Sequence, residues 1–101
     1  MGKYEHSKVT DLSIGKYYIV VSLTNVIEAL EYYDLEWRGG ELKNPYYLEY
    51  HVTDRTTYRT IEYKVFMGKD LEEGIQKFGS IEKFFEHIVN MLQKKYENTR
   101  D

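Results

Sequence analysis

Apolar and polar residues alternate along several stretches of the chain, and a period of two residues predicts β-strands. The first such stretch is Lys16–Leu23, where Tyr17 and every second residue after it fall on one face. Its other face, which starts at Tyr18, is also fairly apolar. Because both faces are apolar, we expect this strand to lie in the centre of a sheet.

Two further stretches predict a β-hairpin, with strands at Tyr46–Val52 and Tyr58–Phe66 around a turn at Thr53–Thr57. A loop of two or four residues without a bulge would place the apolar sets of the two strands on the same face. That register pairs Tyr46 with Tyr63 and Leu48 with Ile61. The outward face would then carry Tyr47, Glu49, His51, Tyr58, Thr60, Glu62 and Lys64.

The end of the chain has helical periodicity instead. From Ile81 to about Tyr96, apolar residues recur every three or four positions, and Ser80 is suited to cap the first turn. A shorter helix over residues 70–78 is expected to open with a capping box of Asp70 and Glu73 and to end at Gly79.

A third helix is expected from Asn25 to Tyr33, with Asn25 as its N-cap. From Tyr33 onward a strand pattern competes with the helical one as far as residue 38, so the boundary stays open. Together, the patterns predict an α+β fold. We expect a mainly antiparallel sheet of three to five strands, with a C-terminal amphipathic helix packed on one face. Residues 1–101 fit one domain, in which residues 1–12 are either mobile or an edge strand.

Composition narrows the class of protein. The chain has 14 basic and 17 acidic residues, a net charge of −3, and no cysteine. The lack of cysteine excludes disulfides, thiol nucleophiles and cysteine zinc sites. No basic stripe stands out, which argues against binding to duplex nucleic acid. No apolar stretch is long enough to span a bilayer, and the first residues do not resemble a signal peptide. We therefore expect a cytoplasmic protein, in the host cytoplasm if it is viral.

Candidate catalytic groups are few. Glu49 and His51 would share one face of a strand and could act as an acid–base pair, but we favour an ordinary polar contact of His51 with Tyr58 on the next strand. Several carboxylates gather between residues 28 and 36, but no calcium-binding loop accompanies them. No phosphate-binding loop or serine elbow occurs. We therefore predict no metal, no cofactor and no catalytic residue.

Tyrosine is the feature that stands out, with 11 residues in the chain. Tyr47 and Tyr58, joined by Tyr18 if it shares their face, are expected to form an exposed aromatic platform. Such a platform suits a protein interface or the stacking of single-stranded bases. The alternative interpretation is that these tyrosines are covered by a second layer, either the helix at 70–78 or a dimer partner. The candidate binding residues are Tyr18, Tyr47, Glu49, His51, Tyr58 and Glu62.

These observations favour a small non-enzymatic binding protein that acts through protein–protein contact. Its AT-rich-codon composition, with abundant Lys, Tyr and Ile, is typical of virus- or phage-type accessory proteins and inhibitors. A homodimer is a natural form for so small a domain. The alternative hypothesis is a single-stranded nucleic-acid binder that uses the tyrosine face. A third hypothesis is a small metal-dependent hydrolase or nuclease.

Overall fold

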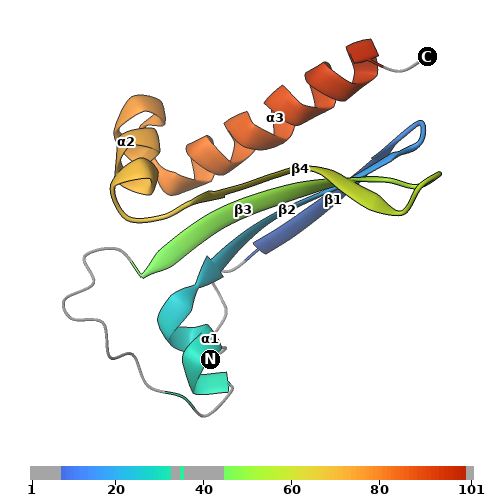
Figure 1. The fold of residues 1–101 in the computed structure, drawn as a ribbon. Coiled ribbons are helices and arrows are strands. Elements are labelled where there is room, and N and C mark those ends of the chain that lie inside the picture. Colours follow the sequence, from blue (N-terminus) through green and yellow to red (C-terminus); the bar gives the residue numbers. More distant parts are fainter. Residues whose placement is uncertain (1–7, 33–34, 36–44, 100–101) are drawn as a thin grey trace.

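The protein forms a four-stranded antiparallel sheet covered by two helices (Figure 1). The computed structural model describes residues 8–32, 35 and 45–99. The strands lie side by side in chain order: β1 (Lys8–Ile14), β2 (Tyr17–Asn25), β3 (Tyr46–Asp54) and β4 (Arg59–Phe66). The helices are α1 (Val26–Tyr32), between β2 and β3, and α2 (Lys69–Phe78) and α3 (Ile81–Thr99), which follow β4.

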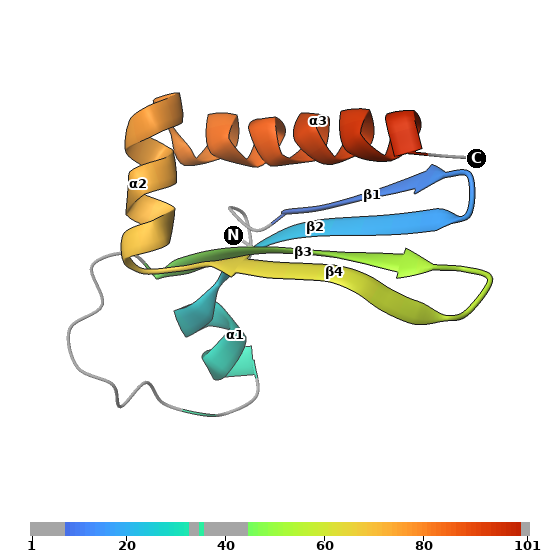
Figure 2. The same cartoon turned by 45° about the horizontal axis from the view of Figure 1, so that its top comes forward.

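The helices α2 and α3 lie on the same side of the sheet. In Figures 1 and 2, α3 runs along the sheet, α2 crosses its end, and α1 lies on the opposite side. The core fills the space under α3, which packs mainly on β1 and β2. Its fully buried side chains come from β2, β3, α2 and α3 and include Ile19, Val21, Leu48, Val52, Leu71 and Leu92. The predicted α+β fold, with a C-terminal helix across one sheet face, is confirmed.

The end of α2 and the start of α3 follow local sequence signals, whereas the start of α2 does not. Gly79 ends α2 in the left-handed conformation, at φ 99°, and its N–H bonds the carbonyl of Ile75. The Ser80 hydroxyl accepts a hydrogen bond from the Lys83 N–H at 3.1 Å, as a cap does. The predicted capping box at Asp70 is wrong, because α2 begins one residue earlier and its N-cap is Gly68, which has no side chain to offer.

The N-terminal half also follows its pattern. The predicted central strand is β2, and α1 begins directly after Asn25. Residues 8–12 belong to the edge strand β1, while residues 1–7 lie outside the described part of the chain. The competing strand pattern at 33–38 also lies outside the described residues, apart from Leu35.

The hairpin of β3 and β4 forms, but its predicted register is wrong. The turn is formed by residues 55–58, and Leu48 pairs with Phe66 rather than with Ile61. Between the pairs Val52–Glu62 and Thr53–Thr60, the register shifts by one residue, so that Ile61 is the extra residue of a β-bulge. One added residue turns every following side chain to the other face.

The bulge changes which β4 side chains meet the helices. Glu62 and Lys64 pair with Val52 and Tyr50, so they lie on the face that α3 covers. The expected outward positions of these two residues are therefore wrong. Tyr63, which we expected to face the core, lies on the opposite face and is 59% exposed.

Candidate functional site

The sheet face opposite α2 and α3, here called the open face, brings together most of the candidate residues. Cross-strand pairing arranges it in rows that run from β1 to β4. The side chains from β2 and β3 are half-buried, whereas those at the two edges are exposed, apart from the half-buried Val65. The three complete rows are Val9–Ser22–Glu49–Val65, Asp11–Val20–His51–Tyr63 and Ser13–Tyr18–Thr53–Thr60.

At the end of the open face near the turns, Tyr18 is held from two sides. Its hydroxyl donates a hydrogen bond to Asp11 at 2.8 Å, and the guanidinium of Arg55 lies 5.2 Å from the centre of its ring. Arg55 also donates to the hydroxyl of Ser13. The hydrogen bond to Asp11 raises the pKa of Tyr18, so its hydroxyl stays protonated and its ring keeps one orientation.

The middle of the open face has a similar arrangement. The Tyr63 hydroxyl donates to Glu49 on β3 at 3.1 Å, and this hydrogen bond raises the pKa of Tyr63. Between the two tyrosine–carboxylate pairs lie Val20 and His51, which are direct neighbours on β2 and β3. The open face therefore combines an apolar centre with two aromatic rings whose hydroxyls are already bonded to carboxylates.

The structure brings together four of the six predicted binding residues. Tyr18, Tyr47, Glu49 and His51 all lie on the open face, and Tyr47 sits opposite Thr24 toward its other end. Tyr58 does not lie on this face: it ends the hairpin turn at φ 61° and is 87% exposed. The cross-strand neighbour of His51 is accordingly Tyr63 and not Tyr58.

Other residues of the open face were not singled out from the sequence. Tyr63 was assigned to the core, and the bulge that reverses it has no clear sequence signal. Val20 and Asp11 could have been found, because an apolar residue on the second face of a central strand and a polar residue in an edge strand are both visible in the pattern. The helix 70–78, which we considered as a cover for the tyrosines, packs with α3 on the other side.

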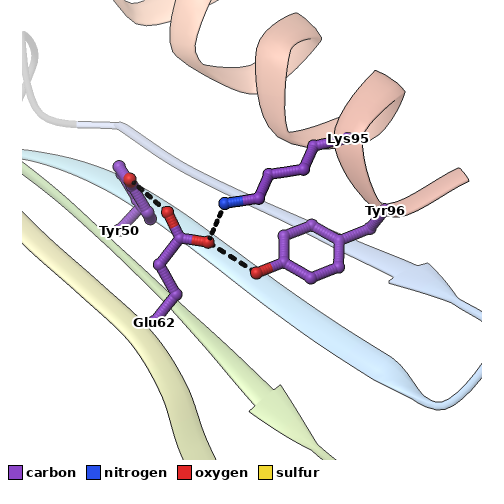
Figure 3. A network of polar contacts seen from close by, with 4 residues as sticks. All are labelled: Tyr50, Glu62, Lys95 and Tyr96. Atoms are coloured by element: carbon purple, nitrogen blue, oxygen red, sulfur yellow. Dashed lines mark hydrogen bonds and ion pairs between the residues drawn. The ribbon is translucent and has the colours of Figure 1, made fainter. Parts of the chain in front are cut away.

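Glu62 belongs to a separate polar network on the covered face (Figure 3). Its carboxylate accepts hydrogen bonds from the hydroxyls of Tyr50, at 2.7 Å, and Tyr96, at 2.5 Å. The Lys95 ammonium lies 2.7 Å from the same carboxylate. Because Tyr96 and Lys95 come from α3, the network joins the last turns of this helix to β4.

The electrostatics of the network favour a structural role. Burial and the hydrogen bond to Glu62 raise the pKa of Tyr50 to about 12, and the same causes raise the pKa of Tyr96. Burial acts to raise the pKa of Glu62, but the hydrogen bonds from Lys95, Tyr96 and Tyr50 outweigh it and lower that pKa. At neutral pH the carboxylate is thus charged and both phenols are neutral, which leaves no activated nucleophile or base.

A shallow cleft of about 370 Å³ lies in the corner between β4, α2 and α3. Aromatic rings line it, with Phe78 stacked on His87 at a centroid distance of 4.1 Å and Phe66 packed edge-on against Phe84. Lys64, Lys77, Asp70 and Glu73 stand around it. Its charged groups are balanced in sign, so no ligand charge is favoured.

The catalytic hypothesis gains no support from this geometry. Glu49 and His51 do share a face, but Glu49 already accepts the Tyr63 hydroxyl. Among the described residues, no three His, Asp or Glu side chains are grouped so that they could hold a metal ion.

Of the helices that the structure describes, none is both long and apolar enough to cross a membrane.

Comparison of the chain with protein-family models, with curated proteins and with solved structures finds no match. The functional argument therefore rests on the residues of the open face.

Proposed function

We propose that this protein is a non-enzymatic binding module that docks on another protein through its open face. The observation that supports this proposal is the pair of tyrosines, Tyr18 and Tyr63, whose hydroxyls are bonded to Asp11 and Glu49 around the apolar Val20. Large aromatic side chains are the residues that contribute most to protein interfaces. Binding without chemistry is also how a small inhibitor or accessory subunit acts.

The hydrogen bonds matter because they fix the rings before a partner arrives. Ordering a side chain on binding costs about 0.5–1.5 kcal/mol. Tyr18, held by Asp11 and by the cation of Arg55, has already lost much of that freedom during folding. A partner surface with an apolar centre and basic side chains around it would fit this face, because Asp11 and Glu49 are acidic.

The same carboxylates argue against a nucleic-acid ligand. A protein that stacks single-stranded bases on tyrosines normally follows the phosphates with a positively charged groove. Here two carboxylates, Asp11 and Glu49, are bonded to the two rings and would repel phosphate groups, against the cation of Arg55 beside the Tyr18 ring. We therefore favour a protein partner, and binding of an oligonucleotide is an outcome that the test must distinguish.

The test is affinity capture from extracts of the source cells with the tagged protein and matched variants. Val20→Lys places a charge in the apolar centre of the open face, and Tyr18→Ala removes one ring. Gln76→Lys, on exposed α2, is the control because it adds the same charge on the other side of the molecule. We expect one partner to be recovered with the parent protein and the control and to be reduced at least about 10-fold with both open-face variants.

Tyr18→Phe sharpens the test, because it keeps the ring and removes only the bond to Asp11. We expect it to retain most of the partner. Equal capture by Val20→Lys and the parent protein, or no partner with any variant, would refute the proposal. Binding of a labelled single-stranded oligonucleotide at low salt that Tyr47→Ala abolishes would support the nucleic-acid alternative instead.

A further inference from the structure

β4 is an edge strand whose outer side no other described element pairs with, since the sheet ends there. Two of its side chains outside the core are large and well exposed: Ile61 is 48% exposed and Tyr63 is 59% exposed. The helix α3 packs mainly on β1 and β2. It reaches β4 through the side chains of Lys95 and Tyr96, which contact Glu62 on the covered face. An edge with these properties can accept another strand.

The sequence of β4 complements itself in one antiparallel register. If Tyr63 lies opposite Tyr63 of a second copy, Glu62 faces Lys64 and Ile61 faces Val65. The unlike charges then meet on the helix side of the sheet, and the apolar residues form one row on the open face. Opposite charges and aromatic or β-branched pairs are the favourable cross-strand combinations.

The neighbouring registers lack this complementarity. A shift of one residue places Tyr63 opposite Lys64 in one direction and opposite Glu62 in the other, so that the aromatic ring meets a charged side chain. A shift of two residues in one direction places Glu62 opposite Glu62, and in the other direction places Lys64 opposite Lys64. Like charges directly opposite each other are destabilising. The charges of β4 thus select a single register.

We propose that two copies of this chain associate through β4, with Tyr63 on the two-fold axis, to form one continuous sheet from the strands of both copies. The Tyr63 pair lies on the axis and occurs once, and every other pair occurs twice, as two-fold symmetry requires. The inference goes beyond the binding of a partner at the open face and does not depend on it.

The surroundings of the two charged residues fit this association. Lys64 is exposed, with its ammonium 5.2 Å from the centre of the Phe66 ring, so it is free to turn toward a second copy. Glu62 keeps part of its carboxylate accessible beside Lys95, with 24% of the side chain exposed, and can meet a second ammonium there. Lys64 also disfavours the pairing of β4 with strands that have no acidic residue opposite it, because an unpaired charge on an edge strand opposes the addition of another strand.

The direct test uses single cysteines, because the chain has none of its own. Tyr63→Cys, Ile61→Cys and Val65→Cys are each treated with a short thiol-specific crosslinker. We expect Tyr63→Cys to crosslink to itself. Ile61→Cys and Val65→Cys should crosslink efficiently only when they are mixed, because they face each other and not their own copies. Self-crosslinking of either one that equals the mixture would overturn the register.

The second measurement is sedimentation velocity over a range of concentrations. Tyr63→Lys places two ammonium groups opposite each other on the axis, while within one copy the new charge lies beside Glu49. Val9→Lys is the matched control, since Val9 is 69% exposed on the other edge strand of the same face. We expect the dissociation constant to rise by at least about 10-fold with Tyr63→Lys and by less than about 2-fold with the control.

The parent protein must itself dimerise for the inference to stand. A monomer up to about millimolar concentration, where only very weak association remains, would overturn it. A dimer that Tyr63→Lys leaves intact, or that Val9→Lys weakens equally, would place the contact elsewhere and would overturn it as well. The circular dichroism spectrum of each variant shows whether its fold is kept.

Discussion

Removal of the Glu62 carboxylate should destabilise the fold strongly, although the side chain is only partly buried. In Glu62→Ala, the hydroxyls of Tyr50 and Tyr96 lose their shared acceptor, and these residues are 4% and 5% exposed. Leaving a buried polar group unsatisfied costs about 1–3 kcal/mol. Two such groups give a loss of about 2–6 kcal/mol, to which the half-exposed Lys95 ion pair adds at most ~1 kcal/mol.

The assay is urea and thermal unfolding followed by circular dichroism. A loss of 3–4 kcal/mol, near the middle of the estimated range of about 2–6 kcal/mol, lowers the melting temperature by roughly 12–30 °C in a chain of this size. Glu86→Ala is the control, because Glu86 is an exposed acid on α3, the helix that carries Lys95 and Tyr96, and we expect it to change stability by less than about 0.5 kcal/mol. A loss below about 1 kcal/mol in Glu62→Ala, or one equal to the control, would refute the reasoning.

The acid side of the pH profile checks the same network. The pKa of Glu62 is lowered in the folded protein, so its contribution is present above the ordinary carboxyl pKa and is lost as the pH falls through the lowered value. The difference in unfolding free energy between the parent protein and Glu62→Ala should therefore narrow at acidic pH. A constant difference down to the acid unfolding range would show that the charge of Glu62 is not what stabilises the network.

Three further outcomes follow from particular residues. Because the pKa of Tyr50 rises from 10.0 to about 12 on folding, its contribution is complete below pH 10 and is lost as the pH rises toward 12; in urea unfolding across this interval the parent protein should lose about 2–3 kcal/mol more than Tyr50→Phe, in which the loss from Tyr96 remains. Gly74→Ala should destabilise by about 1–3 kcal/mol despite the better helix propensity of alanine, since its Cβ would meet the buried Phe84 ring; thermal unfolding measures this, and a gain in stability would contradict it. Ser80→Ala should cost about 1 kcal/mol in the same assay because the Lys83 N–H loses its cap, whereas Ser80→Asp should retain most of the stability.

The sequence predicted the elements of the fold well because each has a strong local signal. The alternation in β2, the apolar stripe of α3 and the stop at Gly79 are properties of neighbouring residues, and the structure confirms them. The predicted N-cap of α2, Asp70, was wrong by two residues, because the N-cap is Gly68, which has no side chain to signal the position. Boundaries of this kind carry little side-chain signal.

The faces of β4 could not be predicted, because one residue reverses them. The hairpin register depends on the turn length and on the bulge at Ile61, and both are set by the fit of the whole strand pair. Glu62 is partly buried on the covered face, but its charge makes it look like a surface residue in the sequence. Its partners Tyr50 and Tyr96 lie 12 and 34 positions away, so no local pattern reveals them.

The connection between β2 and β3 can be lengthened at little cost to folding. β1 with β2, and β3 with β4, are local hairpins, whereas joining β2 to β3 closes an excursion of about 20 residues between Asn25 and Tyr46. At its base the N–H of Val26 bonds the carbonyl of Pro45, which fastens both ends at one point. Doubling such an excursion costs only about 0.6 kcal/mol in closure entropy. Lengthening or replacing this connection should therefore leave the strand register unchanged, which makes it the place where the chain can gain new sequence at the lowest cost to folding.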